Sequence, residues 1–377
     1  GALKHNLALR DEIKHKLTYK DIEPRMKEAL WKYKHCSQKK PSGQIKKETE
    51  ALRKYWGCYP LHYFRYGLYR TDKNLPMETL LDYIPEFFFY RLFLSYYDDD
   101  KYSIILNDKN IMEELFRAVN IAQPDTLAKI INGGLYDREQ QPLYFEDLQE
   151  KLAAKGYKRI FLKPVDGQGG YGIKVFHLNH ENRYMCGGHD LWDTISEIQK
   201  NKRDFILQKG IIQHPELAAI YPNSVNTFRI ATENIGGEVR IVCSVLRMGK
   251  DGREVDNACQ DGIVLGNDID GGKCRDYAIT ERGAVFFSHP DTRFGFKGHT
   301  FTHWDEIKTF AIESARKLPQ FTYLGWDIAL TSEGPAAIET NMGFGLDLYQ
   351  MSLGGLRDNF RITEPEKYWK CRRDAIG

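Results

Sequence analysis

A glycine-rich segment between two apolar runs constrains the fold of this chain more than any other feature. Residues 163–173 have the sequence KPVDGQGGYGI, with the spacing GxGxxG at Gly167, Gly169 and Gly172. A dinucleotide-binding loop of that spacing needs a helix directly after the glycines. Residues 173–178 instead alternate between apolar and polar side chains, which is typical of a strand. The segment therefore predicts a strand, a glycine loop and a second strand.

Such a loop can fold over a polyphosphate with its backbone N–H groups pointing inward, because glycine permits close approach and positive φ. Lys163 lies directly before the loop, within reach of the same phosphates. The chain contains neither the GxxxxGK[ST] phosphate loop nor the HRD and DFG motifs of protein kinases. The alternative is a glycine-rich hairpin that binds no ligand.

A second informative segment runs from residue 325 to residue 341. Its centre, residues 332–335, has the sequence SEGP, which predicts a turn, so the flanks pair as an antiparallel hairpin. Folding about that turn brings Asp327 level with Glu339, and Asn341 lies on the same face as Glu339. Two carboxylates and an amide oxygen are ligands suited to Mg²⁺. The alternative is a hairpin with two solvent-facing acids.

The remaining patterns, strands mixed with helices, predict an α/β or α+β protein, and α+β is the class expected here. Residues 1–100 are expected to be mainly helical, with an amphipathic helix around residues 7–17 and helix starts at Pro24 and Pro60. Further along, strands are predicted at 102–106, 159–162, 173–176, 205–208, 227–232 and 239–246, and helices at 109–119, 191–201 and 304–318.

Charge and cysteine content bear on partners and compartment. Residues 1–75 hold 18 Lys and Arg against 8 Asp and Glu, and aromatic residues are interspersed with basic ones at 55–70. This basic region is either a solvated helical surface or a contact for a glycan, nucleic acid or anionic lipid. The chain has no apolar run of membrane-spanning length. Its seven scattered cysteines predict reduced thiols in a cytoplasmic protein.

The glycine segment with Lys163, followed by the carboxylate hairpin, resembles the ATP-grasp superfamily over about residues 100–350. Residues 208–213 and 222–230 are similar to the sugar-transfer associated ATP-grasp branch. The resemblance implies an ATP-grasp fold with an additional helical N-terminal region. It divides the chain into that region (1–100), a small central subdomain (101–157), a nucleotide-lid subdomain (158–212) and a C-terminal subdomain with the metal-binding hairpin (213–377).

The resemblance also implies roles for individual residues. Lys109 and Lys163 correspond to the two ATP lysines, and Arg229 to the arginine that steadies the transferred phosphoryl group, so Arg229 and Lys163 are the expected catalytic residues. Glu216 is an alternative ribose contact, because Gln208-Lys209-Gly210 stands where the family commonly has a glutamate. The expected phosphate loop consists of Gly167, Gln168, Gly169, Gly170 and Gly172. The linker expected to contact adenine contains Gln208, Lys209 and Ile211, and the expected Mg²⁺ ligands are Asp327, Glu339 and Asn341.

The function implied is an ATP- and Mg²⁺-dependent ligase that joins a carboxylate to an amine through an acyl phosphate and releases ADP and phosphate. Its expected substrates are small molecules or glycans, the product being part of a cell-surface polysaccharide or its precursor, with no stable nucleic-acid partner. A phosphotransferase acting on a sugar or an amino acid is the first alternative. The second is a non-catalytic module whose basic aromatic region binds a glycan or nucleic acid.

Overall fold

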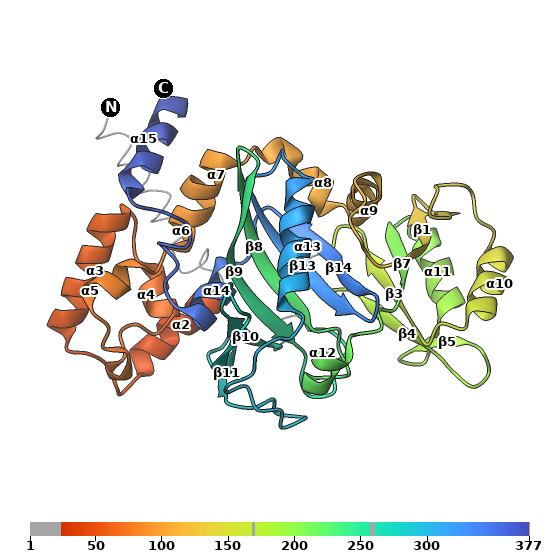
Figure 1. The fold of residues 1–377 in the computed structure, drawn as a ribbon, viewed down its shortest axis with the longest axis horizontal. Coiled ribbons are helices and arrows are strands. Elements are labelled where there is room, and N and C mark those ends of the chain that lie inside the picture. The colour runs from red at the N-terminus through yellow and green to blue at the C-terminus, as the bar shows by residue number, and fades with distance from the viewer. Residues whose placement is uncertain (1–23, 168–169, 257–260, 377) are drawn as a thin grey trace. The chain divides into compact units, whose positions relative to one another are not determined.

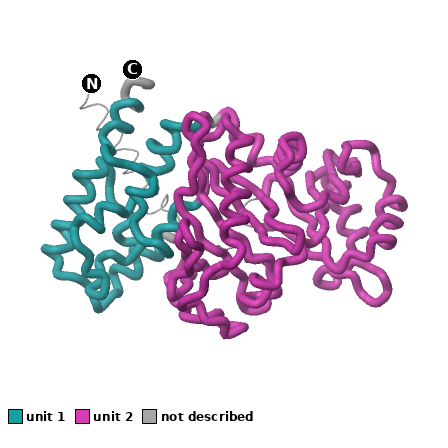
Figure 2. Tube along the Cα trace, in the orientation of Figure 1, with its two compact units in different colours: residues 1–98, 345–377 teal, residues 99–344 magenta. Residues whose placement is uncertain are grey.

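The computed structural model describes residues 24–376 except 168–169 and 257–260, so the amphipathic helix expected at 7–17 lies outside the described residues. The chain divides into two compact units (Figure 2): unit 1 comprises residues 1–98 and 345–377, and unit 2 comprises residues 99–344. Residues 345–377, which the sequence analysis placed in the last subdomain, cluster with the N-terminal region. The finer boundaries at 157/158 and 212/213 stay predictions.

Unit 1 is helical, as expected from its sequence (Figure 1). Pro60 directly precedes α4, so this proline-marked helix start is confirmed, whereas Pro24 of α2 is the first described residue and its role as a helix start stays a prediction. Its elements are α2 (Pro24–His35), α3 (Ser42–Trp56), α4 (Leu61–Arg65), η1 (Thr71–Lys73), α5 (Met77–Leu81), α6 (Glu86–Phe88), η2 (Phe89–Phe93), α7 (Leu94–Tyr97), α14 (Leu346–Leu353) and α15 (Pro365–Ile376).

Aromatic side chains form the core of unit 1. Trp56 is fully buried and meets Phe88 edge-on, with 4.8 Å between ring centroids. The Trp369 indole of α15 donates a hydrogen bond to the Trp56 carbonyl at 2.9 Å. A side chain at Gly57, which ends α3 at φ 72°, would collide with that indole. Most aromatic rings of residues 55–70 are therefore part of this core and unavailable for stacking on a ligand.

Unit 2 consists of two antiparallel seven-stranded sheets with helices packed against them. The first sheet has the order β2-β1-β7-β3-β4-β5-β6, and the second has the order β12-β11-β10-β9-β8-β13-β14. The strands of the first are β1 (Thr126–Ile131), β2 (Gly134–Tyr136), β3 (Arg159–Pro164), β4 (Lys174–Leu178), β5 (Tyr184–Cys186), β6 (His189–Asp190) and β7 (Phe205–Lys209). Those of the second are β8 (Thr227–Ile235), β9 (Glu238–Met248), β10 (Ile263–Asn267), β11 (Cys274–Thr280), β12 (Val285–Phe286), β13 (Tyr323–Thr331) and β14 (Gly334–Asn341).

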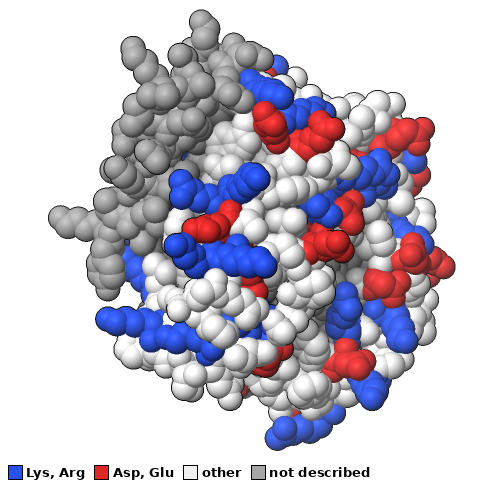
Figure 3. Space-filling model, turned by 90° about the vertical axis from the view of Figure 1, so that its left-hand side faces the viewer, with Lys and Arg blue, Asp and Glu red and all other residues white. Residues whose placement is uncertain are grey.

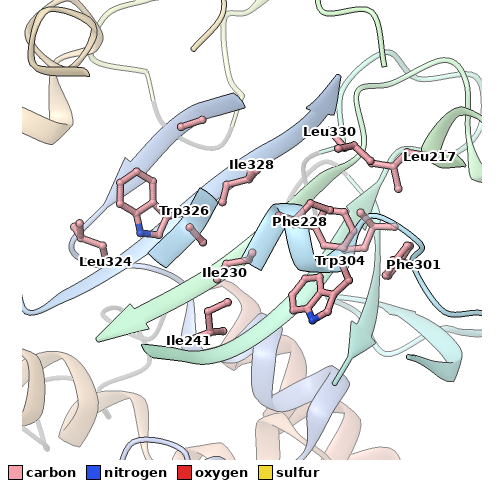
Figure 4. Packing of buried hydrophobic residues seen from close by; sticks show 14 of the residues in the cluster. Leu217, Phe228, Ile230, Ile241, Phe301, Trp304, Leu324, Trp326, Ile328 and Leu330 are labelled. Atoms are coloured by element: carbon pink, nitrogen blue, oxygen red, sulfur yellow. The ribbon is translucent and has the colours of Figure 1, made fainter. Parts of the chain in front are cut away.

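The helices of unit 2 bury one apolar face each against these sheets. Leucines and isoleucines of α10 (Phe145–Lys155) and α11 (Leu191–Lys200) fill the core of the first sheet. The second sheet packs on α8 (Ser103–Asn107), α9 (Lys109–Ala118), α12 (Pro215–Ile220) and α13 (Trp304–Arg316). Figure 4 shows Trp304 of α13 beside Phe228 and Ile230 of β8, with Trp326 of β13 in the same apolar layer.

One strand prediction was wrong. Residues 102–106 form the end of η3 (Asp100–Tyr102) and helix α8 rather than a strand. In a strand, Ile104 and Leu106 would share one face. Here Ile104 is 65% exposed whereas Leu106 is 4% exposed. A short apolar run does not distinguish the two periods. The other predicted strands and helices of residues 109–318 are present, with ends within a few residues of those expected.

The charged surface also bears on the sequence hypotheses. On the face shown in Figure 3, Lys and Arg are interspersed with Asp and Glu instead of forming one continuous basic area. Among the described residues, no helix is both long enough and apolar enough to cross a bilayer.

Candidate active site

One pocket in unit 2 brings together most of the residues that the sequence singled out. Its walls come from α9, from β3 and β7 of the first sheet and from β8, β9, β13 and β14 of the second. The predicted residues in its lining are Lys109, Lys163, Gly167, Gly170, Gln208, Lys209, Ile211, Asp327 and Glu339. Gly172, Arg229 and Asn341 lie outside the lining but next to residues in it, and Gln168 and Gly169 lie outside the described residues.

Two lysines face this pocket from different elements. Lys163 projects from β3, and its Nζ donates to Gln208 Oε1 on the paired strand β7 at 2.9 Å. Lys109 is the first residue of α9, whose start is capped by the Asp108 carboxylate accepting from the amides of Asn110 at 2.9 Å and Ile111 at 3.0 Å. The Lys109 ammonium donates to the Gly167 carbonyl. Both cations therefore lie at the start of the glycine loop.

Burial controls the charge of Lys163. Burial is the main cause that lowers the pKa of Lys163 to about 8, the nearby Lys109 cation acts in the same direction, and the Glu339 and Asp256 carboxylates act in the opposite direction. An anionic group beside Lys163 would favour the ammonium form. A bound phosphate would therefore raise the pKa of Lys163 and increase its protonated fraction.

The glycine loop connects β3 to β4, as predicted. A side chain at Gly167 would meet the Pro164 ring at 2.6 Å, so the close turn after β3 requires a glycine. Gly172 has φ 77°, which other residues rarely adopt. Gly172 therefore shapes the loop, whereas Gly167 and Gly170 line the pocket.

The carboxylate hairpin has the predicted register. Asp327 on β13 pairs directly with Glu339 on β14, and Gly325 pairs with Asn341. On its other side Asp327 pairs with Arg229 on β8. Arg229, Asp327 and Glu339 consequently form one row across three neighbouring strands (the charged row).

Hydrogen bonds join the charged row. The Arg229 guanidinium binds both Asp327 oxygens, with Nη2 2.8 Å from Oδ2, and the side chains of Asp327 and Glu339 share a hydrogen bond. Burial raises the pKa of Glu339, and the adjacent Asp327 raises it further. Burial acts on Asp327 in the same direction, but Arg229 and Arg247 outweigh it and lower its pKa. The row therefore holds one carboxyl group with a lowered pKa beside one with a raised pKa.

A divalent cation fits this donor set. Two adjacent buried carboxyls cannot both ionise cheaply unless a cation replaces the shared proton. Asn341 Nδ2 donates to Glu339 Oε1 at 3.5 Å, so a side chain that also carries an amide oxygen lies beside the pair. Carboxylate and amide oxygens are the ligands of Mg²⁺.

The site residues expected from the sequence omit four charged residues of the pocket lining, namely Glu113, Arg247, Glu254 and Asp256. Arg247 on β9 lies opposite Thr227, with Nη2 3.1 Å from Asp327 Oδ2 and 3.3 Å from Asp256 Oδ1. Burial raises the pKa of Asp256, against the effect of Arg247. A signal was present, because Arg247 interrupts the otherwise apolar end of β9. Its partner β8 carries Arg229 two residues beyond the position opposite Arg247.

Other residues that the sequence singled out lie elsewhere. Glu216, the alternative ribose contact, does not line the pocket. Its carboxylate accepts from the Thr302 amide at 2.6 Å and meets His303 Nδ1 at 2.9 Å. Burial would raise the pKa of Glu216, but these hydrogen bonds outweigh it and lower the pKa.

Comparison with known proteins gives one family match. The model of the family described as "Sugar-transfer associated ATP-grasp" matches residues 89–364. No curated protein matches the sequence.

Solved structures that resemble the chain share little sequence with it. D-alanine–D-alanine ligase from Bacillus anthracis is 12% identical over 72% of this chain and 70% of that one, with a TM-score of 0.38. The biotin carboxylase domain of 2-oxoglutarate carboxylase from Hydrogenobacter thermophilus, solved with MgADP, ADP and bicarbonate, is 14% identical over 69% of this chain, with a TM-score of 0.39. The match spans 45% of that carboxylase chain.

Proposed function

The chain belongs to the sugar-transfer associated ATP-grasp family, and from this membership we propose that its pocket binds ATP with Mg²⁺ and joins a carboxylate to an amine. One observation carries the proposal. Asp327 and Glu339 of the charged row line the same pocket as Lys109 and Lys163, and Arg229 lies directly behind Asp327 on the neighbouring strand. That arrangement supplies cations for a triphosphate and oxygen ligands for its metal ion.

The parts of the pocket suggest where ATP would lie. Gln208 and Lys209 at the end of β7 and Ile211 just after it would contact the base. The loop at Gly167–Gly172 would cover the triphosphate, with Lys109 and Lys163 beside it. Asp327, Glu339 and Asn341 would hold Mg²⁺, which offsets phosphate charge when bound.

The chemistry follows from what these groups can stabilise. Amide formation from a free carboxylate is unfavourable in water, so a carboxylate oxygen first attacks the γ-phosphorus of ATP, which forms an acyl phosphate and releases ADP. An amine then attacks the acyl carbon, the C–O bond to phosphate breaks, and inorganic phosphate and a proton leave. The chain must hold the reactants in line and neutralise charge on the transferred group. Arg229 and Arg247 present guanidinium groups suited to phosphate oxygens. We further propose that the amide belongs to a cell-surface polysaccharide or its precursor, in keeping with the family's description.

The test is a product assay. Purified protein with ATP and Mg²⁺ is incubated with pairs of uronic acids, amino acids and amino sugars, and ADP and inorganic phosphate are measured separately. The proposal requires both products in equal amounts, together with an amide detected by mass spectrometry. ADP with a stable phosphorylated product and no free phosphate would show a phosphotransferase instead. Release of AMP would exclude the acyl-phosphate scheme.

Substitutions identify the site. Lys163→Ala and Asp327→Asn should each abolish turnover, whereas Lys151→Ala, on the exposed side of α10, should not. Turnover that persists in the first two variants would place the reaction elsewhere.

A further inference from the structure

A cluster of two histidines and a glutamate lies outside the pocket, where α12 and α13 begin. His214 is the residue before α12, Glu216 lies in the first turn of that helix, and His303 is the residue before α13. One potential ligand atom from each of the three side chains lies within 4.8 Å of the other two. All three are half-buried, so solvent can reach them.

Existing hydrogen bonds orient these groups without using all their ligand atoms. His214 Nδ1 accepts from the Glu216 amide at 3.2 Å, which leaves its Nε2 available. Glu216 Oε1 accepts from the Thr302 amide at 2.6 Å, and Oε2 meets His303 Nδ1 at 2.9 Å. The His214 and His303 rings lie 4.2 Å apart between centroids. Both imidazoles thus lie beside one carboxylate.

A third imidazole lies next to the cluster. His299 interacts electrostatically with Glu216. Its Nε2 is buried and has no hydrogen-bond partner among the described residues. Buried polar atoms without a partner are uncommon in folded proteins. His299 Nε2 is therefore the one nearby ligand atom that internal hydrogen bonding leaves unexplained.

We propose that His214, Glu216 and His303 form a zinc site, distinct from the proposed Mg²⁺ site and independent of it. Two imidazoles and one carboxylate suit Zn²⁺, whereas Mg²⁺ prefers oxygen ligands alone. Metal–ligand bonds of about 2.0–2.2 Å place tetrahedral ligands about 3.4 Å apart. Side-chain shifts of about 1.5 Å or less suffice from the present positions. Water would complete the coordination.

A metal ion at this site would hold in place residues 211–214, which lead from the pocket toward the second sheet. The His214 amide already donates to the Leu330 carbonyl of β13 at 2.9 Å, and the Ser332 amide donates to Ile212 at 3.3 Å. Ile211, three residues before His214, lines the pocket. A zinc ion held between His214 and His303 would tie the starts of α12 and α13 together beside this segment.

The test measures zinc binding to the full chain. Chelator-treated protein is titrated with zinc chloride against a chromophoric competitor, in excess Mg²⁺ so that the carboxylates of the charged row are occupied. The expected result is one zinc equivalent per chain and a higher Tm with zinc. Cobalt(II) chloride should give the intense visible bands of a tetrahedral site.

Two variants keep the helix starts intact while removing ligands. His214→Asn retains an N-cap acceptor for the Glu216 amide, and His303→Gln retains a polar side chain. Each should weaken zinc binding by about 100-fold or more and remove the zinc-dependent rise in Tm. His180→Ala, whose side chain is 90% exposed, is the matched control and should bind as the wild type does.

Two results would overturn the proposal. The first is equal zinc binding by the wild type and both variants. The second is the absence of a zinc equivalent in the wild type, in which case the Tm of Glu216→Gln should fall equally with and without zinc. The second result would identify the cluster as a Glu216–His303 ion pair only. Neither depends on ATP turnover, so the zinc site and the proposed ligase activity can fail separately.

Discussion

Two adjacent carboxyl groups of the charged row should respond in opposite ways when each is made neutral. Asp327 is 2% exposed and has guanidinium nitrogens of Arg229 at 2.8 Å and Arg247 at 3.1 Å. Glu339 is its cross-strand partner, and its main charged neighbour within the row is Asp327 itself. Asp327→Asn removes the carboxylate that balances two buried cations, whereas Glu339→Gln removes one of two like charges.

The expected change in the free energy of unfolding follows from the distances between these charged atoms. At an effective dielectric constant of about 20, a charge pair about 3 Å apart gains about 5 kcal/mol, most of which offsets the desolvation of the two ions. Removing one member of such a buried pair costs about 3–5 kcal/mol, because the other remains buried and uncompensated. We therefore expect Asp327→Asn to lower the free energy of unfolding by about that amount and Glu339→Gln not to lower it.

The dependence on pH follows from the directions of the pKa shifts. The pKa of Asp327 is below its usual 3.8, so its contribution is complete at neutral pH and is lost as the pH falls below that value. The pKa of Glu339 is above 4.5, so its ionisation costs stability as the pH rises past that value. The penalty of Asp327→Asn should shrink in acid, and any gain from Glu339→Gln should grow toward neutral pH.

The assay is urea unfolding in a chelating buffer, so that no divalent cation screens the pair. Asp305→Asn, whose side chain is 89% exposed, and the exposed Glu333→Gln are matched controls expected to stay within about 0.5 kcal/mol of the wild type. Equal losses for Asp327→Asn and Glu339→Gln would refute the reasoning, because they would show that Glu339 is stabilised by cations as much as Asp327 is.

Other outcomes follow from the same geometry. Because burial lowers the pKa of Lys163 to about 8, the protein should take up protons when ATP binds near pH 8. Calorimetry in buffers of different ionisation enthalpy measures this uptake. Lys163→Arg should abolish it, and an unchanged uptake would contradict the assignment of the proton to Lys163. Arg247→Ala removes a cation from the pocket wall and should lower kcat by about 100-fold or more in the product assay. A change in KM alone would show that Arg247 contributes to substrate binding and not to the chemical step. Asp108→Ala removes the cap of α9 and should lower the free energy of unfolding in urea by about 1 kcal/mol. It should also weaken ATP binding, because Lys109 is the first residue of that helix. Asp108→Asn preserves the cap and should have neither effect.

The parts of the site that local sequence determines were predictable. A turn sequence at residues 332–335 and the two-residue alternation of strands were enough to pair Asp327 with Glu339. The glycine spacing and the alternation after it gave the strand–loop–strand arrangement around Gly167. In both cases the relevant residues are within about twenty positions of each other, so local periodicity carried the information.

What could not be predicted depends on pairing between distant segments. Arg247 belongs to the site only because β9 pairs with β8, which pairs with β13, and no local pattern specifies that order. The position of residues 345–377 depends in the same way on Trp369 packing beside Trp56 and Gly57, more than 300 positions earlier in the chain. Helix α8 was predicted as a strand because a five-residue apolar run fits both the helical and the strand period. Only packing against the rest of the fold determines which of its side chains are buried.

The electrostatics of the pocket give a physical reason to expect a charged ligand there. The pKa of Lys163 is lowered and those of Glu339 and Asp256 are raised, mainly by burial, so all three shifts disfavour the charged form. Burial therefore carries a cost for the charge of each group that the interactions within the unliganded protein do not fully offset. A triphosphate beside Lys163 and a divalent cation beside Glu339 would each favour the charged form of its neighbour. The same burial that makes these side chains costly to the fold would then make their interaction with Mg²⁺ and phosphate strong, since water competes least where the pocket is driest.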